Sequence, residues 1–376
     1  MSKILHINSN YLTSKLHENL MDRLEGPNDF NNTIFMPMKE EKKDEILYES
    51  NYQVYNPVTF KDRDKFLFRY KQGKIYRKLK ETVSIEAFDL VHAHTLFTDG
   101  NVAMRIKKEY GIPYIVAVRG YTDINSFFKK RIDLRHRGRE ILKHASRIIF
   151  LSQKNCDELL NTYIKDPQLR ASLEKKIEIL PNGIDDIYFE KEYQPKNLPT
   201  DQALKFIEVG KVMKIKNQMN SMKGIQIFEK KYNQETEFNI VGKIVDRNYA
   251  QEIQEKNSGN TNFYTPVPPE KLISLLRDQH IFIMPSYYET FGLVYPEAMS
   301  QGLPVIYSKN QGFDGQFEEG YIGYRVDPHD PLDIAEKINK IVENYSELSQ
   351  NAIQAYKKFS WDILAEEYIA IYKSIV

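Results

Sequence analysis

The sequence contains a single cysteine, Cys156, among 376 residues. One thiol cannot form an intramolecular disulfide, and no cysteines and histidines recur at zinc-site spacing, so disulfide scaffolds and structural zinc folds are excluded. Long apolar runs are also missing: residues 148–151 form one of the longest, far short of the roughly 18 that cross a bilayer. Residues 3–7 give way at once to the polar Asn8, so no signal peptide is expected. These absences predict a soluble, cytoplasmic protein.

Glycine-rich nucleotide motifs and internal repeats are missing as well. No Gly-x-Gly-x-x-Gly follows the apolar run at residues 4–7, which weakens the dehydrogenase alternative. No segment of roughly 20–50 residues repeats, so solenoids and propellers are disfavoured. What the sequence does contain is enough for a large core, because 41% of the residues are hydrophobic and 28% are charged. At 376 residues, against roughly 150 per domain, two domains are expected.

The net charge of +1 conceals an asymmetry along the chain. Residues 51–150 hold 21 Lys and Arg against 10 Asp and Glu, whereas residues 251–350 hold 7 against 15. A basic surface on the first half would suit an anionic partner. Solvated charges that happen to segregate explain the same counts, and both interpretations stay open.

Short apolar runs alternate with amphipathic segments along the chain, which is typical of βαβ units and a parallel sheet. The strands that we expect in the first half lie near residues 4–7, 89–94, 114–118, 147–151 and 177–180. A polar, proline-containing stretch at about 186–203 interrupts the alternation. The strands that we expect after it lie near residues 206–209, 238–241, 262–264, 281–284 and 304–306.

The predicted fold is therefore α/β, with two Rossmann-like, doubly wound domains and a cleft between them. We place the first domain at residues 1–190, with a C-terminal helix at 360–376 crossing back to it, and the second domain at residues 200–359. Open parallel sheets bind ligands at the carboxyl ends of their strands, so the loops at those ends are the places to look for chemistry.

The most informative loop is residues 285–298, directly after the strand expected at 281–284. Pro296 is tolerated in a helix only within the first turn, so the next helix begins near residue 293 or 294. Glu289 then lies in the loop and Glu297 about one turn inside the helix. Two such carboxylates can accept hydrogen bonds from the vicinal hydroxyls of a sugar. An isolated pair would more often be solvated, but the strand–loop–helix context favours a binding site.

The same helix start leaves the amides of Phe291, Gly292 and Leu293 free for an anion or a hydroxyl. A second loop of interest begins at Gly210, which ends the first strand of the second series. Lysines follow Gly210 before the next helix, and Lys211 and Lys216 could neutralise a diphosphate held there. An exposed, lysine-rich loop without a ligand is the commoner alternative.

These two loops resemble the retaining GT-B glycosyltransferases of family 4, also called glycosyl transferases group 1. Glu289 and Glu297 have the spacing of that family's Glu-x7-Glu motif, and Gly210, Lys211 and Lys216 stand where the family has Gly-Arg and then Lys. Further segments that resemble the family are residues 92–94, 111–113, 181–185, 291–293, 297–299, 302–305 and 359–361.

The resemblance implies that the second domain holds a nucleotide-sugar donor. The expected donor is a UDP-sugar. The donor contacts that the resemblance implies are Glu297 for the ribose, Lys211 and Lys216 for the diphosphate beside Gly210, and Glu289 with the amides of Phe291 and Gly292 for the sugar. Leu293 is also expected among the donor-binding residues. Cations and amides would stabilise the leaving diphosphate, so no metal and no other cofactor is expected. The resemblance also implies retention of anomeric configuration, by displacement on one face of the sugar.

The first domain departs from the family pattern at the residues expected to face the acceptor. Arg119 follows the strand at 114–118, where many members have His, and it either faces the donor or an acidic acceptor or pairs with Asp123. His94 ends a strand at the expected cleft, so it has either an acceptor-side or a structural role. The Asp62 and Asp64 pair has an Asp-x-Asp shape, but it follows no buried strand and we expect it at the surface.

Two further departures lie in the donor loops. Residues 6–16 contain no glycine where the family has a Gly-Gly pair. Lys211 replaces the usual Arg and lacks its two-pronged donor. Residues 61–80 interleave basic and aromatic side chains, and 129–147 form a second basic cluster, so a face within 61–147 suits an anionic membrane or a polyanionic acceptor. No RNA-binding module is recognisable, and nucleic acid is not expected as a partner.

We therefore expect a retaining hexosyl- or N-acetylhexosaminyltransferase that acts on a glycan, a lipid-linked or a teichoic-type acceptor of the cell envelope. The residues expected to carry catalysis are Glu289, Lys216, Lys211 and Arg119, with His94, Arg119 and Asp123 on the acceptor side. The alternatives are a nucleotide-sugar epimerase or phosphorylase on the same fold, and an inactive sugar-nucleotide-binding partner. The expected location is cytoplasmic, peripheral at the inner face of the membrane.

Overall fold

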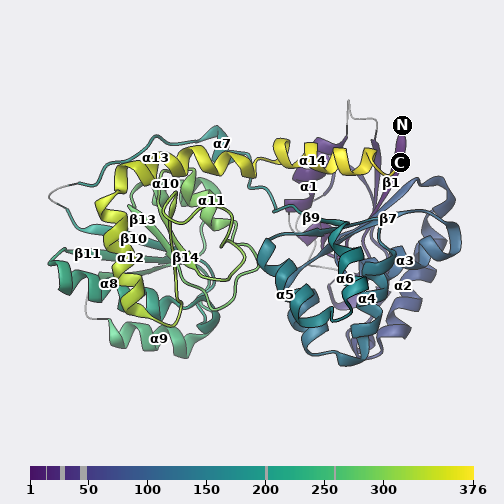
Figure 1. Cartoon of the computed structure of the whole chain (residues 1–376), viewed down its shortest axis with the longest axis horizontal. Helices are drawn as coiled ribbons and strands as arrows, with labels where there is room; N and C mark the ends of the chain where they lie inside the picture. The colour runs from purple at the N-terminus through teal and green to yellow at the C-terminus, as the bar shows by residue number, and fades with distance from the viewer. Residues whose placement is uncertain (14, 26–29, 43–48, 200–201, 258–259) are drawn as a thin grey trace. The chain divides into compact units, whose positions relative to one another are not determined.

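The computed structural model describes the chain apart from residues 14, 26–29, 43–48, 200–201 and 258–259 (Figure 1). The described residues form two compact units. Unit 1 consists of Met1–Asn182 together with Trp361–Val376, and unit 2 consists of Gly183–Ser360. The expected polar boundary at 186–203 therefore groups with unit 2, and residues 200–201 of that boundary lie outside the described residues.

Unit 1 is built on a seven-stranded parallel sheet in the order β4-β2-β1-β6-β7-β8-β9. Its strands are β1 (Ser2–Ile7), β2 (Phe30–Phe35), β4 (Gln53–Tyr55), β6 (Leu90–Ala93), β7 (Tyr114–Val118), β8 (Arg147–Phe150) and β9 (Ile177–Ile179). Beside it, β3 (Met38–Lys39) and β5 (Val58–Phe60) form a separate parallel pair. The chain order reverses at β1, which is the signature of a doubly wound sheet.

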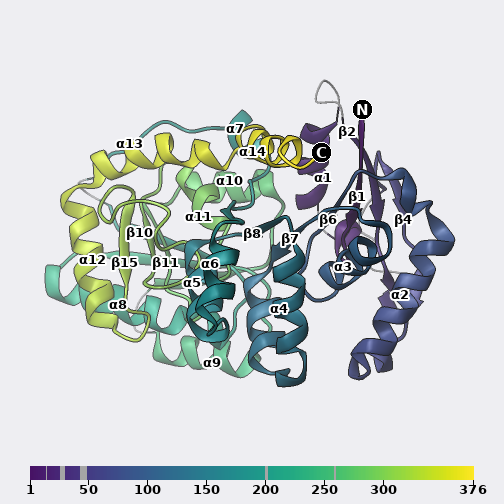
Figure 2. The same ribbon diagram turned by 45° about the vertical axis from the view of Figure 1, so that its right-hand side comes forward.

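Helices cover both faces of this sheet, because alternate strand residues are apolar on opposite sides. Ile4 packs with α1 (Leu16–Leu24) and α14 (Trp361–Lys373), whereas its neighbour Leu5 packs into the opposite core. That opposite core holds α2 (Phe68–Thr82), α3 (Asp99–Tyr110), α4 (Arg135–His144), α5 (Gln153–Tyr163) and α6 (Pro167–Glu174). Figure 2 shows α14 beside α1, although the two helices are at opposite ends of the chain.

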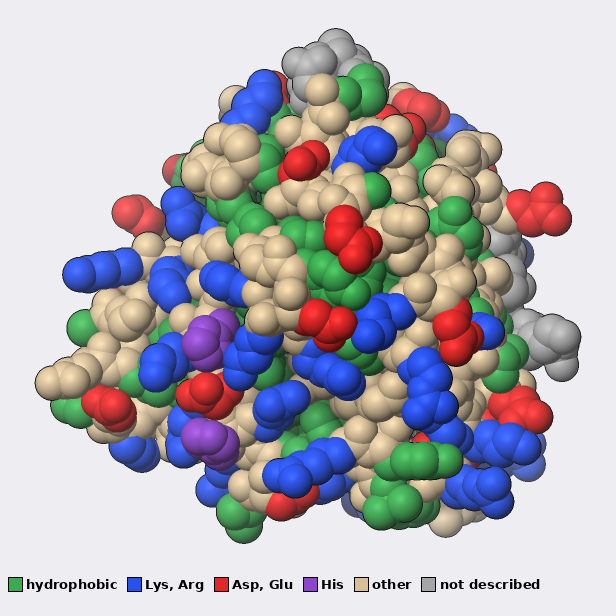
Figure 3. Space-filling model, turned by 90° about the vertical axis from the view of Figure 1, so that its right-hand side faces the viewer, with side chains coloured by type: hydrophobic (Ala, Val, Ile, Leu, Met, Phe, Trp, Pro, Cys, Tyr) green, Lys and Arg blue, Asp and Glu red, His purple; other side chains and the backbone are tan. Residues whose placement is uncertain are grey.

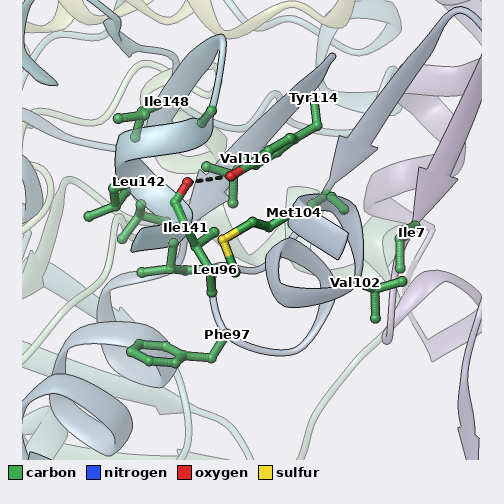
Figure 4. Close-up of a cluster of buried hydrophobic side chains, with 14 of the residues drawn as sticks. Ile7, Leu96, Phe97, Val102, Met104, Tyr114, Val116, Ile141, Leu142 and Ile148 are labelled. Carbon is green, nitrogen blue, oxygen red and sulfur yellow. Dashed lines mark hydrogen bonds between the residues drawn. The ribbon is translucent and has the colours of Figure 1, made fainter. Parts of the chain in front are cut away.

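The core under α3 and α4 illustrates how tightly this unit is packed (Figure 4). The Tyr114 hydroxyl, on β7, donates a hydrogen bond to the carbonyl of Ile141 on α4, so its polar atom is satisfied without leaving the core. Gly100 lets α3 approach the sheet, since a Cβ there would lie 2.9 Å from Val116 Cγ2.

Unit 2 repeats the design with a six-stranded parallel sheet in the order β12-β11-β10-β13-β14-β15. Its strands are β10 (Leu204–Val209), β11 (Thr236–Val241), β12 (Asn260–Tyr264), β13 (Ile281–Met284), β14 (Val305–Ser308) and β15 (Gly323–Val326). One face carries α8 (Gln218–Tyr232), α9 (Arg247–Lys256) and α12 (Pro331–Glu343). The other carries α7 (Ile187–Glu190), α10 (Pro269–Arg277), α11 (Val294–Met299) and α13 (Tyr345–Ala355).

The α/β prediction is confirmed, and all ten expected strands exist in the expected order. Ser152 also caps α5 as expected, since its hydroxyl accepts a hydrogen bond from the Asn155 amide at 3.3 Å. The sequence did not predict β2, β3, β4, β5 and β15, which carry polar residues or are short. No helix in the described part of the chain is both long and apolar enough to cross a membrane.

Candidate functional site

The candidate site of unit 2 lies where β10, β11 and β13 end. These strands are adjacent and parallel, so the loops that follow them meet at one edge of the sheet. Gly210 and Gly242 close the ends of β10 and β11 against each other: a Cβ on Gly242 would lie 1.9 Å from the Gly210 carbonyl oxygen. Only glycine allows this approach, which fixes the path of the lysine loop that follows Gly210.

Asn217 then ties the lysine loop to the loop after β13. Asn217 is buried in a left-handed conformation, with φ 66°, and its Nδ2 donates to the carbonyl oxygens of Pro285 and Pro328 at 2.8 and 2.7 Å. A backbone bond from the Tyr287 amide to the Ile215 carbonyl adds a second tie at 2.9 Å. The two loops that the sequence singled out are thus one structural element, and the sequence analysis did not foresee Asn217.

The consequence is a direct ion pair between the two loops. Lys216 Nζ lies 2.5 Å from Glu289 Oε2, and both side chains are largely buried, with 22% and 13% of their surface exposed. A charge-assisted bond between groups this well shielded from water is stronger than a surface ion pair. The structure therefore brings together two residues that the resemblance assigned to different parts of the donor: Lys216 to the diphosphate and Glu289 to the sugar.

The backbone around Glu289 is held from outside its own loop. The Glu289 amide donates to Gln311 Oε1 at 3.0 Å, and the Gly312 amide donates to the Glu289 carbonyl at 3.0 Å. A Cβ on Gly312 would lie 2.0 Å from the Thr290 carbonyl oxygen, so the segment after β14 packs directly on this loop. Gln311 and Gly312 are positioning residues that local sequence patterns did not reveal.

The turn into α11 forms as the sequence predicts. The helix begins at Val294, and Gly292 has φ 90°, a left-handed conformation that favours glycine. The amides of Phe291, Gly292 and Leu293 donate to no acceptor among the described residues. Three donors are therefore available beside the Lys216–Glu289 pair.

Glu297 lies on the first turn of α11 and is partly buried. Its Oε2 accepts a hydrogen bond from the Tyr188 hydroxyl at 3.3 Å. Burial raises the pKa of Glu297 to about 7, and the Tyr188 bond opposes that rise. Near neutral pH this carboxyl can therefore either accept or donate a hydrogen bond.

A third carboxyl, Glu208, lies beneath this site and was missed by the sequence analysis. It is fully buried on β10; Ser221 Oγ donates to its Oε2 at 2.7 Å, and its Oε1 has no partner among the described residues. Burial raises its pKa to about 8, against the opposing charge of Lys216. Glu208 stands among the apolar Phe206, Ile207 and Val209, and a carboxyl group within such a run was the available signal.

Lys211 behaves differently from Lys216. It is exposed, and it forms no ion pair within the described part of the chain. Its ammonium group is therefore accessible to an anion that arrives from solvent.

The expected acceptor-side residues of unit 1 lie around the end of β7. Arg119 Nε donates to the His94 carbonyl at 2.9 Å and its Nη1 donates to Asn182 Oδ1 at 3.4 Å, so the guanidinium itself does not bond Asp123. Asp123 is fully buried and accepts from the amides of Arg119, Leu96 and Phe97 at 2.7, 3.0 and 3.3 Å. The Asp123 carboxylate therefore holds the loop, and an acceptor contact through it stays a prediction.

His94 is not a lone histidine. Its Nε2 is 3.0 Å from His6 Nδ1, and its ring stacks on His92 at 4.1 Å between centroids. His6 also bonds Asn32 Oδ1 at 2.9 Å. All three rings are buried. Burial, and then the charges of neighbouring histidines and of Arg119, hold the pKa of His92 and His94 well below the usual range.

These three histidines each place one nitrogen within 4.8 Å of the others, close enough to share a metal ion. The spacing in the sequence did not show this, because His6 comes from β1 and the other two from the end of β6. The positive charge of Arg119 beside them opposes a cation. The acceptor-side and the structural interpretations of His94 both stay predictions.

Of the two carboxylates in the Asp-x-Asp pair, which we expected at the surface, only Asp62 is partly exposed. Asp62 bonds Lys39 and Lys65. Asp64 is buried, not at the surface: it bonds Lys74 Nζ at 2.7 Å and accepts from the Lys61 amide at 3.0 Å, which caps the turn before α2. Both carboxylates are neutralised by lysines, so neither is available as a metal ligand.

Comparison with known proteins places this architecture in a family. The model of glycosyl transferases group 1 matches residues 189–359, and the model of Glycosyltransferase Family 4 matches residues 19–187. Together they account for nearly all of both units. The chain belongs to this family of glycosyltransferases, and it is a glycosyltransferase enzyme of the GT-B type, as the sequence resemblance predicted.

Individual relatives are distant. A D-inositol 3-phosphate glycosyltransferase of Acidothermus cellulolyticus is 22% identical over 309 residues, which cover 76% of this chain and 67% of the relative. An uncharacterized glycosyltransferase of Methanocaldococcus jannaschii is 26% identical over 294 residues, 76% of each chain. Among similar D-inositol 3-phosphate glycosyltransferases the match spans 55% to 73% of the relative's length.

Solved structures agree on the fold. Sucrose-phosphate synthase from Thermosynechococcus elongatus has a TM-score of 0.74 at 19% identity, covering 100% of this chain and 99% of that one. Anabaena HepE, solved in complex with UDP and glucose, has a TM-score of 0.69 at 16% identity over 100% of both chains. These similarities confirm the GT-B fold.

Proposed function

We propose that the protein transfers a hexosyl or N-acetylhexosaminyl residue from a UDP-sugar to an acceptor of the cell envelope, with retention of anomeric configuration. The observation that carries the proposal is the Lys216–Glu289 pair beside three free amides, with Glu297 one turn further on. A cation, donors and a carboxylate at one sheet edge are the groups that a sugar diphosphate needs.

Each group has a distinct part in this proposal. Glu297 accepts hydrogen bonds from the ribose hydroxyls, and Lys211 and Lys216 neutralise the diphosphate. Glu289 and the amides of Phe291 and Gly292 hold the sugar. Because Lys216 already bonds Glu289, one lysine orients the sugar contact and the leaving group together.

The reaction breaks the bond from the anomeric carbon to the diphosphate oxygen and forms the bond to the acceptor oxygen on the same face. The acceptor proton passes to the departing diphosphate, whose charge Lys211, Lys216 and the amides stabilise. On this scheme the transfer requires no metal ion. Support for the donor class comes from the fold neighbour HepE, which binds UDP and glucose, while the sugar and the acceptor differ among the relatives.

The test is calorimetric titration with UDP, GDP, dTDP and CMP, each with and without EDTA. Selective binding of UDP that survives EDTA and is lost in Glu297→Ala supports the donor site. Turnover then separates an enzyme from an inactive binding partner: sugar is transferred or hydrolysed, and Glu289→Ala abolishes this while the circular dichroism spectrum is unchanged. Binding of no nucleotide would overturn the proposal.

The proposed acceptor is a glycan, a lipid-linked or a teichoic-type molecule. We also propose that the basic face within residues 61–147 binds an anionic membrane surface. Figure 3 shows Lys and Arg side chains gathered on one face, with hydrophobic side chains exposed among them. Phe66, Leu67 and Ile132 are 72%, 63% and 70% exposed in this basic region. Co-sedimentation with liposomes should require anionic lipid and weaken with salt; binding indifferent to both would exclude the membrane.

A further inference from the structure

Unit 1 contains a groove of about 1040 Å³ that no step of the proposed transfer uses. It opens where α2, α3 and α4 begin, and α3 packs on both of the other helices (Figure 2). These helix starts lie on the carboxyl side of the parallel sheet, the side on which doubly wound sheets bind ligands. The volume is that of a site for a sizeable small molecule.

The walls of the groove are apolar on two sides. Phe66 and Leu67, in the turn before α2, are largely exposed. Phe68 and Leu134 are buried and fix the lower part of the walls. Phe68 also packs edge-on against Phe97 and is therefore a rigid part of the core rather than a loose flap. An occupant that covers these side chains must itself be partly apolar.

Four arginines line the same groove: Arg69, Arg105, Arg131 and Arg137. Burial, and then the charges of Arg105 and Arg69, lower the pKa of Arg137, so both of these guanidinium groups lie close enough to Arg137 to repel it. Asp133 is the one carboxylate among the described lining residues, and Arg131 already binds both its oxygens at 2.9 and 2.7 Å. Within the described lining, no carboxylate is left for Arg69, Arg105 and Arg137; outside it, the charge of Glu140 offsets part of the repulsion at Arg137.

A buried polar chain leads from this cluster to an unsatisfied donor. Arg137 Nε donates to Asn101 Oδ1 at 2.6 Å, and Asn101 Nδ2 donates to Gln72 Oε1 at 2.9 Å. Gln72 is only 2% exposed, and its Nε2 has no partner among the described residues. A buried N–H without an acceptor costs free energy, and Gln72 lines the groove, so a turn of its side chain toward an anionic oxygen there would satisfy the N–H.

We propose that this groove binds a lipid phosphate, with the phosphate at Arg69, Arg105, Arg137 and Gln72 and the hydrocarbon chain along Phe66, Leu67 and Phe68. An apolar groove alone would suit a hydrophobic peptide, and arginines alone would suit any anion. Both together, around one volume, select an anionic amphiphile. The assignment of this ligand as the acceptor rests on the proposed function, whereas its binding does not.

The experiment is calorimetric titration of the full chain with octyl phosphate below its micellar concentration, with inorganic phosphate and octanol as matched probes. Octyl phosphate should bind at least about tenfold more tightly than either probe, because only it fills both parts of the groove. Affinity should also rise along the series butyl, hexyl and octyl phosphate. These readouts need neither donor nor turnover, so a failed nucleotide titration leaves them interpretable.

Variants localise the binding. Arg137→Gln should weaken octyl phosphate about tenfold, and so should Arg69→Gln, which changes an exposed side chain and keeps the test valid if Arg137→Gln misfolds. Phe66→Ser should remove much of the chain-length dependence while leaving inorganic phosphate unaffected. Arg63→Gln is the matched control, since Arg63 is exposed in the same basic segment and does not line the groove.

Two results would overturn the proposal. Equal affinity for octyl phosphate and inorganic phosphate would leave an anion site without a lipid chain. Failure to bind any alkyl phosphate, with anionic vesicle binding reduced equally by Arg63→Gln and Arg137→Gln, would mean that the whole basic face meets a membrane and the groove takes no lipid.

Discussion

Lys216 Nζ and Glu289 Oε2 lie 2.5 Å apart although 73 residues separate them in the chain. One residue follows β10 and the other follows β13, and these strands are neighbours in the sheet of unit 2. Asn217 fixes the distance, since its side-chain amide binds the carbonyl of Pro285 at the head of the Glu289 loop. The pair is therefore a property of the fold, formed without a ligand.

The pair predicts non-additive losses of activity. Lys216→Met and Glu289→Gln should each lower kcat/KM by about 10²- to 10³-fold, because each leaves its partner in the wrong charge environment. The double variant should lose much less than the product of the two, since residues in direct contact are coupled. Steady-state transfer from the donor that calorimetry selects is the measurement.

Lys214→Met is the control for the lysine loop, since Lys214 is exposed and lies outside the ion pair. It should change kcat/KM less than about threefold. Strictly multiplicative losses in the double variant, or an equal loss in Lys214→Met, would contradict a specific role for the pair.

The raised pKa of Glu297 predicts a pH-dependent donor affinity. Its pKa is about 7 in the free protein, and it must be ionised to accept both ribose hydroxyls. A proton must therefore leave on binding at pH values below 7, so affinity should fall up to about tenfold per pH unit there and level off above pH 8. Calorimetry with the nucleotide between pH 5.5 and 8.5 checks this.

Glu208, with a pKa of about 8, could contribute a second slope, so the variant Glu297→Gln separates the two. It should bind the nucleotide more weakly at high pH and show little change between pH 6 and 7. An undiminished slope in Glu297→Gln would assign the titration to another group.

The sequence predicted the fold well because its signals are local. Apolar runs at residues 114–118 and 281–284 are bounded by turns, and each became a strand buried on both faces. Strand β2 was missed because its sequence contains Asn31 and Asn32, and Asn32 is buried only because it bonds His6 from a neighbouring strand. That contact depends on pairing that no local pattern contains.

The candidate site likewise has features that local sequence predicts and features that depend on distant segments. One loop and the position of Pro296 were enough to predict Glu289, Glu297 and the free amides. The Glu289 partner of Lys216 could not be predicted in this way, because it lies 73 residues away, and neither could the Leu96 and Phe97 amides that bond Asp123. The sequence thus identified the chemical groups but not their bonding.

Gly242 should be intolerant of any side chain. A Cβ there would lie 1.9 Å from the Gly210 carbonyl oxygen, so Gly242→Ala must displace the backbone that leads into the lysine loop. We expect a loss of about 1–3 kcal/mol of unfolding free energy, with weaker nucleotide binding. Urea denaturation and calorimetry measure the two effects.

Gly73→Ala provides the contrasting case in the interior of α2. No atom lies within 4 Å of a Cβ at Gly73, so alanine should stabilise that helix by about 0.5–1 kcal/mol. A Gly242→Ala protein as stable as the wild type would mean that β10 and β11 can separate at their ends.

Tyr372 should anchor α14 to the sheet of unit 1. Its hydroxyl lies 2.6 Å from His92 Nδ1, across 280 residues of sequence, and both side chains are buried. His92 Nε2 has no partner among the described residues, so Tyr372→Phe leaves both ring nitrogens unsatisfied. The expected cost is about 1–3 kcal/mol of unfolding free energy, seen as faster amide exchange in α14 and β6.

Tyr368→Phe is the control, since Tyr368 is also buried on α14 but has no hydrogen bond among the described residues. It should cost less than about 0.5 kcal/mol. Equal effects of the two variants would show that ring packing alone holds the helix.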